Sequence, residues 1–127
     1  VREVRAQAPR LWVVNHYGQT EAVDTSTALV LRPGDPIPGA AVAPIGDPIW
    51  WRACLVESLS MGGEGELLVA GPVGRYLDAE LDRRSFLEVH LAGRPRRAAR
   101  TGDICRWEGV LRGGFVCLGR RDAQVKV

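Results

Sequence analysis

The chain has 127 residues, of which 46% are apolar and 25% are charged, proportions typical of one globular domain and unlike those of disordered or fibrous proteins. The 17 basic and 15 acidic residues leave a formal net charge of only +2, which argues against nucleic acid or an anionic membrane surface as a partner. The sequence shows neither a signal peptide at its start nor an apolar run of the roughly 18 residues that a membrane span needs, so we expect no membrane partner.

Short strands joined by turns are expected, because 15 glycines and 8 prolines interrupt the chain at short intervals. Residues 11–14 are an apolar run that predicts a buried strand opening into a loop at Asn15. Residues 15–21 would then lie at the carboxyl end of a strand, where open α/β sheets place ligand sites. Residues 28–31 predict a second strand, and the prolines within residues 33–48 predict an extended connection after it.

The middle of the chain predicts a hairpin and a helix. Residues 50–57 and 65–70 read as two strands, and a polar turn containing glycine connects them. Residues 78–89 place apolar side chains among charges in a weak helical pattern, which predicts one short surface helix.

The last third of the chain predicts a second hairpin. Residues 94–100 are strongly basic and favour a loop or an edge strand. Residues 104–107 and 115–118 are apolar runs that flank a loop with three glycines, as in a hairpin.

The three cysteines are odd in number and have no CxxC spacing, which argues against a closed disulfide framework and against a structural zinc site. A reducing, cytoplasmic environment is therefore expected for Cys54, Cys105 and Cys117.

Three blocks of sequence carry a family pattern in a fixed order. The first is Asn-His-Tyr-Gly-Gln-Thr-Glu at 15–21, and the second is Gly-Glu-Leu-Leu-Val-Ala-Gly at 65–71, followed by Tyr76 and Phe86. The third joins Arg-Thr-Gly-Asp at 100–103 to Gly-Arg-Arg-Asp-Ala-Gln-Val-Lys at 119–126. In this order the blocks resemble the adenylate-forming superfamily, which includes acyl-CoA synthetases, adenylation domains of peptide synthetases and luciferases.

The chain departs from the family pattern at a few positions. Gln19 stands where amino-acid-activating members often have proline, and Asp82 replaces the usual threonine. Gly74-Arg75-Tyr76 stands where Arg-Gly-Tyr is usual. Gln19 weakens the assignment to peptide synthetases without weakening the assignment to the superfamily, and the altered second block makes that block an imperfect match.

The resemblance implies a fold that is mainly β with minor α, of the α+β class, taken from the large N-terminal lobe of such an enzyme. Residues 1–32 would end the α/β core and residues 33–118 would form a distorted, β-barrel-like subdomain. Residues 119–127 would begin the hinge to the C-terminal lobe. Since the chain starts at Val1 and stops in an alternating run at Val127, we expect it to be an internal piece of an adenylation domain.

The resemblance also implies roles for the first motif. Tyr17, beside Gly18, would stack on adenine, a contact worth about 1–3 kcal/mol. Thr20 would offer its hydroxyl to the α-phosphate, and Glu21 would help to hold Mg²⁺, a hard cation that prefers carboxylate and phosphate oxygens. A packed core tyrosine and a Thr/Glu helix cap are the structural alternatives for these residues.

The third motif would bind the ribose. Asp103 would accept hydrogen bonds from both ribose hydroxyls, because a carboxylate has two acceptor oxygens, and Arg120 would donate to the same sugar. The alternative for Arg120 is a surface ion pair with Asp122. By position Asp122 matches the hinge residue of the family.

His16 and Asp24 match positions that line the acyl pocket in family members, although Asp24 suits a solvated turn equally well. Trp50 and Trp51 are interpreted as packing residues. The basic run at 94–100 is interpreted as a solvated loop, in preference to a contact for RNA or a phosphopantetheine arm.

The function implied by the resemblance is activation of a small carboxylic or amino acid with ATP and Mg²⁺. The acyl-AMP and pyrophosphate would form first, and the acyl group would then pass to coenzyme A or to a carrier-protein thiol. The chain carries neither the family's phosphate loop nor its C-terminal lysine, so we expect it to need the rest of the parent enzyme for activity. The alternative is a non-catalytic remnant that serves as a nucleotide-binding or docking module.

Overall fold

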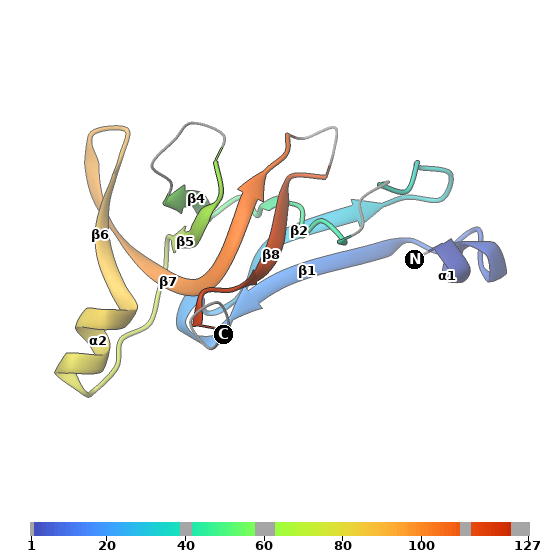
Figure 1. Cartoon of the computed structure of the whole chain (residues 1–127). Helices are drawn as coiled ribbons and strands as arrows, with labels where there is room; N and C mark the ends of the chain where they lie inside the picture. The colour runs from blue at the N-terminus through green and yellow to red at the C-terminus, as the bar shows by residue number, and fades with distance from the viewer. Residues whose placement is uncertain (1, 39–41, 58–62, 110–112, 123–127) are drawn as a thin grey trace.

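A computed structural model of the chain describes residues 2–38, 42–57, 63–109 and 113–122 (Figure 1). Strands dominate and helices are few, which confirms the expected α+β class with mainly β structure. No helix in these ranges is long and apolar enough to cross a lipid bilayer. The elements in chain order are α1 (Arg2–Gln7), β1 (Val13–Gln19), the 3₁₀ turn η1 (Thr20–Ala22), β2 (Asp24–Leu31), β3 (Asp47–Pro48), β4 (Ala53–Glu57), β5 (Gly65–Ala70), α2 (Ala79–Ser85), β6 (Phe86–Leu91), β7 (Arg94–Trp107) and β8 (Phe115–Arg120).

The strands form two antiparallel sheets. The first has the order β1-β2-β3, and its long β1-β2 ribbon extends away from the curved second sheet (Figure 1). The second has the order β4-β5-β7-β6, with β8 added to the far half of β7. Over the described residues this second sheet stays open and does not close into a barrel.

Residues 15–19 of the first motif lie inside β1, so the expectation that the strand ends at Asn15 was wrong; only Thr20 and Glu21 follow the strand, in η1. β1 continues from Val13 to Gln19, because Asn15 and Tyr17 still pair with β2 at Leu29 and Thr27. The polar character of Asn15 suggested an end, but cross-strand pairing extends the strand. The register shifts between Tyr17 and Gly18, and a Cβ atom at Gly18 would lie 1.9 Å from the carbonyl oxygen of Asp24. Only glycine fits at this crossing.

The hairpin expected in the middle of the chain is confirmed by the antiparallel pairing of β4 with β5. β5 supplies the centre of the core, with Leu67 and Val69 fully buried on one face and Leu68 on the other. Because both faces of β5 are covered, its apolar run is continuous and does not alternate with polar residues.

The basic run at 94–100 is not a loop, and within the described residues it is a sheet edge only at 94–97, which pair with β6 alone. It forms the first half of β7, a 14-residue strand that pairs with β6 on one side and with β5 on the other. Ala98 and Ala99 are fully buried at the crossing with β5; of the arginines before them, Arg94 and Arg96 are exposed and Arg97 lies half-buried over the Phe86 ring. Two alanines among arginines give a weak hydrophobic signal, so only the tertiary contacts reveal a central strand.

The helix expected at 78–89 is shorter than predicted. α2 begins after Asp78, whose carboxylate accepts a hydrogen bond from the backbone N–H of Leu81 at 2.7 Å, and it ends at Ser85. Phe86 then starts β6 and is buried against Val69 and Ala99. The aromatic residue that completed the helical pattern is therefore a core residue of the sheet.

Cys105 and Cys117 form a disulfide, with their Cα atoms 4.2 Å apart, so the expectation that the cysteines stay unpaired was wrong. The two residues face each other across β7 and β8. A separation of 12 residues between two cysteines matches no known disulfide or metal-binding motif, so the sequence did not predict this pair. The register of the β7–β8 hairpin brings the two sulfur atoms together. Cys54 is a free thiol, and burial, partly offset by Arg52, raises its pKa to about 12.

Candidate functional site

A polar depression of about 440 Å³ gathers the ends of several elements. It lies between the end of β1 with η1, the end of α2, the middle of β7 and the residues that close β8. Its lining residues are Gln19, Glu21, Glu66, Arg84, Ser85, Arg100, Thr101, Gly102, Arg120 and Arg121. The first motif and both halves of the third motif therefore meet at one place, although about 100 residues separate their ends in sequence.

Tyr17 and Asp103 are joined directly beside this depression. The Tyr17 hydroxyl donates a hydrogen bond to Oδ2 of Asp103 at 2.5 Å. Burial, followed by this hydrogen bond, raises the pKa of Tyr17, so the phenol stays protonated and remains a donor. The ring packs against the apolar cluster that contains Leu67 and Phe115. The Tyr17 ring thus belongs partly to the core, as the structural alternative held. Its hydroxyl binds Asp103, the carboxylate predicted to bind the ribose.

A bulge in β7 aims Asp103. Glu66 pairs with Ile104 and Leu68 pairs with Arg100, so over this stretch β7 contains two more residues than β5 does. Gly102 adopts a positive φ of 72°, a conformation that glycine adopts without strain. Thr101 closes the bulge by donating its hydroxyl to the Leu67 carbonyl at 2.7 Å and accepting from the Asp103 N–H at 3.0 Å. Bulges of this kind re-aim side chains next to functional sites.

Arg120 lies against the same bulge. Its Nη1 donates to the Thr101 carbonyl at 2.7 Å and lies 3.4 Å from Oδ1 of Asp103. Its Nε also pairs with Asp122 at 3.1 Å, so the ion pair that was the structural alternative is present. The hydrogen bond that Arg120 donates to Asp122, with attraction to Asp103, raises the pKa of Arg120 despite desolvation. Arg120 therefore sits between the predicted ribose carboxylate and the predicted hinge residue.

Glu21 is held by the loop that departs from the family pattern. The Tyr76 hydroxyl donates to Oε1 of Glu21, and the N–H of Gly74 donates to the Glu21 carbonyl at 2.7 Å. The hydrogen bond to Glu21 raises the pKa of Tyr76. The altered order Gly74-Arg75-Tyr76 still delivers a tyrosine hydroxyl to this carboxylate.

Thr20 begins η1 and is exposed, and no side chain caps this turn. The helix-cap alternative for Thr20 and Glu21 is therefore not what the structure shows. Over the described residues there is no group of three or more His, Cys, Asp or Glu side chains that could hold a metal ion.

His16 and Asp24 do not line the depression. His16 and Tyr17 are neighbours on β1 and so point to opposite faces of the ribbon. The His16 ring nitrogen Nδ1 lies 3.4 Å from the Thr25 hydroxyl, on the exposed face. Asp24 is exposed at a φ of 72°, which is the turn conformation that its structural alternative implied.

Glu66 is the site residue that sequence reasoning gave no role. It is only 6% exposed, and its carboxylate accepts hydrogen bonds from Arg100, Gly102 and Arg121. The available signal was a single acid inside the apolar strand Gly-Glu-Leu-Leu-Val-Ala. A buried acid is costly unless it is paired, so its presence there indicated partners.

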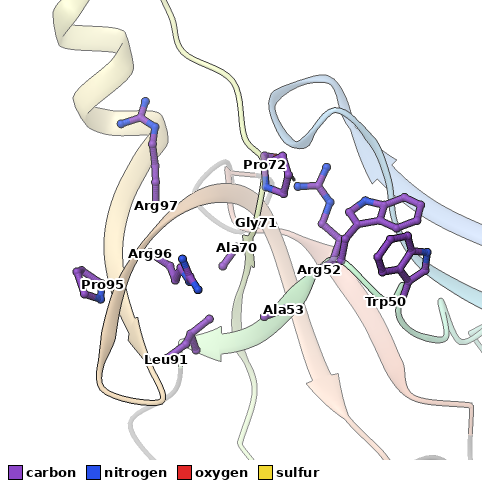
Figure 2. Close-up of a pocket in the computed structure, with 11 residues that line it drawn as sticks. Trp50, Arg52, Ala53, Ala70, Gly71, Pro72, Leu91, Pro95, Arg96 and Arg97 are labelled. Atoms are coloured by element: carbon purple, nitrogen blue, oxygen red, sulfur yellow. Dashed lines mark hydrogen bonds between the residues drawn. The ribbon is translucent and has the colours of Figure 1, made fainter.

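A second hollow of about 610 Å³ lies between the start of β4 and the β6–β7 hairpin (Figure 2). Trp50 lies across it from Leu91, Pro95 and Arg96 of the β6–β7 hairpin (Figure 2), and Trp51 also lines it. Trp50 is 90% exposed, so the interpretation of this residue as a packing residue was wrong. The described residues place none of the predicted site residues in this hollow.

Comparisons with known proteins were made on sequence and on structure. No protein-family model matches the chain. The chain is 37% identical over 122 residues to nonribosomal peptide synthetase 30 of Fusarium vanettenii, covering 91% of the chain and 2% of that protein. It is 36% identical over 132 residues to the phosphinothricin tripeptide synthetase PhsB of Streptomyces viridochromogenes, covering 96% of the chain and 10% of that protein.

Solved structures give the same result. A nonribosomal peptide synthetase protein with adenylation and PCP domains, PA1221, superposes with a TM-score of 0.80 at 31% identity, over 94% of this chain and 22% of that one. The crystal structure of IdnL7 superposes with a TM-score of 0.75 at 36% identity, over 99% of this chain and 26% of that one. The chain thus spans about a quarter or less of the length of each of these four proteins.

Proposed function

Because the chain belongs to the adenylate-forming superfamily and its relatives are nonribosomal peptide synthetases, we propose that the protein carrying it activates an amino acid or another small carboxylic acid with ATP. The observation that carries this proposal is the Tyr17–Asp103 hydrogen bond, which joins the first and third motifs beside a polar depression. A base-stacking ring next to a carboxylate that accepts from a sugar is the arrangement that a nucleoside requires.

The proposed reaction joins the acid to AMP. A carboxylate oxygen of the acid attacks the α-phosphorus of ATP, the bond to the β-phosphate breaks, and pyrophosphate leaves. The residues of this chain position the nucleotide for the attack, which is the larger part of catalysis between two anions. Tyr17 holds the adenine face, Asp103 accepts from the ribose hydroxyls and Arg120 donates to the same sugar.

The residues of η1 would contact the α-phosphate of the nucleotide. The exposed Thr20 hydroxyl is a donor for a phosphate oxygen, and the Glu21 carboxylate is held in place by Tyr76. A magnesium ion, when bound, would offset phosphate charge, and Glu21 is the residue that would hold it. Among the described residues, Tyr76 binds only Oε1 of Glu21, which leaves Oε2 for that purpose.

The acyl group would then pass to a thiol. PA1221 contains adenylation and PCP domains in one protein, which favours a carrier-protein thiol over coenzyme A as the acceptor. β8 ends at Arg120, which pairs with Asp103, and Arg121 and Asp122 follow it at a position that suits a hinge between two lobes. The altered second motif favoured the alternative of a non-catalytic remnant, but Tyr76 nevertheless reaches Glu21.

Pyrophosphate exchange on the full-length protein tests the proposal. A panel of amino acids and aryl carboxylic acids is screened, with the isolated 127-residue chain expected to give only background. Asp103→Ala is the matched variant; losing charge-assisted hydrogen bonds of about 1.5–3 kcal/mol should weaken ATP about 10- to 100-fold. Exchange with none of the acids, or unchanged ATP affinity in Asp103→Ala, would contradict the proposal.

A further inference from the structure

Three residues from three separate segments close a ring of hydrogen bonds at the floor of the depression. Oε1 of Glu66 accepts from the N–H of Gly102 at 3.0 Å. The carbonyl of Gly102 accepts from the N–H of Arg121 at 2.7 Å. Nη1 of Arg121 returns to Oε2 of Glu66 at 2.9 Å. The ring ties β5 to the bulge of β7 and to the residue that follows β8, strands that lie side by side in Figure 1.

Glu66 replaces a backbone partner that the bulge removes. In a regular ladder the N–H of Gly102 would pair with the neighbouring strand, but the register shift takes it out of the ladder. A buried N–H without an acceptor is costly, and the carboxylate supplies that acceptor from the same neighbouring strand. The bulge that aims Asp103 therefore depends on Glu66.

The charge of Glu66 is balanced by two arginines. Nη1 of Arg100 lies 2.9 Å from Oε2, the same oxygen that Arg121 contacts. Desolvation lowers the pKa of Arg100, but the hydrogen bonds and the attraction to Glu57 and Glu66 outweigh it and raise this pKa. A carboxylate that is 6% exposed and holds three donors has one fixed orientation, so it can fix the segments that its donors belong to.

We propose that Glu66 is a positioning residue for the nucleotide, which holds the Asp103 bulge and the Arg121 backbone in one geometry. The inference rests on the proposed function, because it takes Asp103 as the ribose acceptor. This role needs no contact between Glu66 and the nucleotide, because Glu66 acts through Gly102, the residue before Asp103. It also fixes Arg121, the last residue before Asp122, and so sets where a hinge movement can begin.

Glu66→Gln is the direct test, because glutamine keeps the size of the side chain and removes its charge. One amide oxygen cannot accept from Gly102, Arg100 and Arg121 together. Pyrophosphate exchange in the full-length protein should show the KM for ATP raised about tenfold, while the KM for the acid stays within twofold. General loss of structure would lower activity without this separation of the two KM values.

Glu57→Gln is the matched control. Glu57 also pairs with Arg100, at 3.1 Å, but its side chain is 51% exposed and it contacts neither Gly102 nor Arg121. The control should keep both KM values. If Glu66→Gln behaves as Glu57→Gln does, Glu66 has no positioning role and the inference is overturned.

A second measurement does not depend on activity. Hydrogen exchange at the Gly102 amide, resolved by fragmentation of the peptide that contains it, should become at least tenfold faster in Glu66→Gln and unchanged in Glu57→Gln. Arg121→Gln should give part of the same acceleration, and adding it to Glu66→Gln should give no more. If the wild-type protein shows no pyrophosphate exchange, the proposed function is contradicted but the hydrogen-bond ring is not. If hydrogen exchange at Gly102 is unchanged in Glu66→Gln, the hydrogen-bond ring is contradicted.

Discussion

The Tyr17 hydroxyl donates a hydrogen bond of 2.5 Å to Asp103, a residue 86 positions further along the chain. The contact crosses from the first sheet to the second and joins residues to which the family resemblance gives adjoining parts of one nucleotide. Tyr17 therefore serves through its hydroxyl as well as through its ring. The two contributions can be separated by substitution.

Tyr17→Phe removes the hydroxyl and keeps the ring. Asp103 then loses a charge-assisted hydrogen bond worth about 1.5–3 kcal/mol, and its carboxylate is less well oriented. We expect kcat/KM for ATP to fall about tenfold in the full-length protein, with the KM for the acid unchanged. Tyr17→Leu, which removes the ring as well, should cost clearly more. Equal losses in the two variants would show that the hydroxyl has no separate role.

Arg52→Met tests how the two sheets are fastened. Arg52 is buried, and its guanidinium donates to the carbonyl oxygens of Ala22, next to the first sheet, and Pro72, next to the second. Methionine leaves both carbonyls without this donor, at a cost of about 1–3 kcal/mol each. The melting temperature of the full-length protein should fall by several degrees. Arg96→Met, at an exposed arginine, is the control and should change it little.

Cys54 provides a pH-dependent readout. Burial raises its pKa from the ordinary 9.0 to about 12, so the folded state disfavours the thiolate that reacts with iodoacetamide. At pH 8 labelling should be about a thousandfold slower in the native than in the unfolded protein, and it should rise about tenfold per pH unit. Mass spectrometry of the labelled peptide measures this, and fast native labelling at pH 8 would contradict the assigned burial.

The same shift has a consequence for stability. Since the folded pKa is the higher one, the native thiol keeps its proton where the unfolded thiol has lost it. The contribution of Cys54 to stability is complete below pH 9 and is lost as the pH rises from 9 toward about 12. Cys54→Ala removes this pH dependence, and the two proteins should differ progressively above pH 9 in urea unfolding.

Asp122→Pro tests the proposed hinge. Proline fixes φ near −65° and restricts the residue before it, so a pivot at this position would be held in one orientation. Acyl-AMP formation and transfer to the thiol should then slow to very different extents in the full-length protein. Asp122→Ala is the control, because it also removes the ion pair with Arg120 but leaves the backbone free. Similar effects of proline and alanine on both steps would place the pivot elsewhere.

The sequence by itself determined the class of the protein and much of its local structure. The apolar run of Gly65–Ala70 became β5 within its predicted bounds, and the two hairpins paired as their turns indicated. The order of three motifs identified the superfamily. These features are encoded locally, by runs of apolar residues, by turn glycines and by short blocks of fixed spacing.

Only the tertiary structure decided which residues meet. Ala98 and Ala99 carry too little hydrophobic signal to announce a central strand, and β7 is set by its contacts with β5 and β6. The disulfide between Cys105 and Cys117 follows from the register of β7 and β8. The partners of Glu66 come from segments 34 to 55 residues away, brought together by sheet pairing and a bulge. Such long-range contacts depend on how the strands pack against one another, and no local pattern in the chain specifies them.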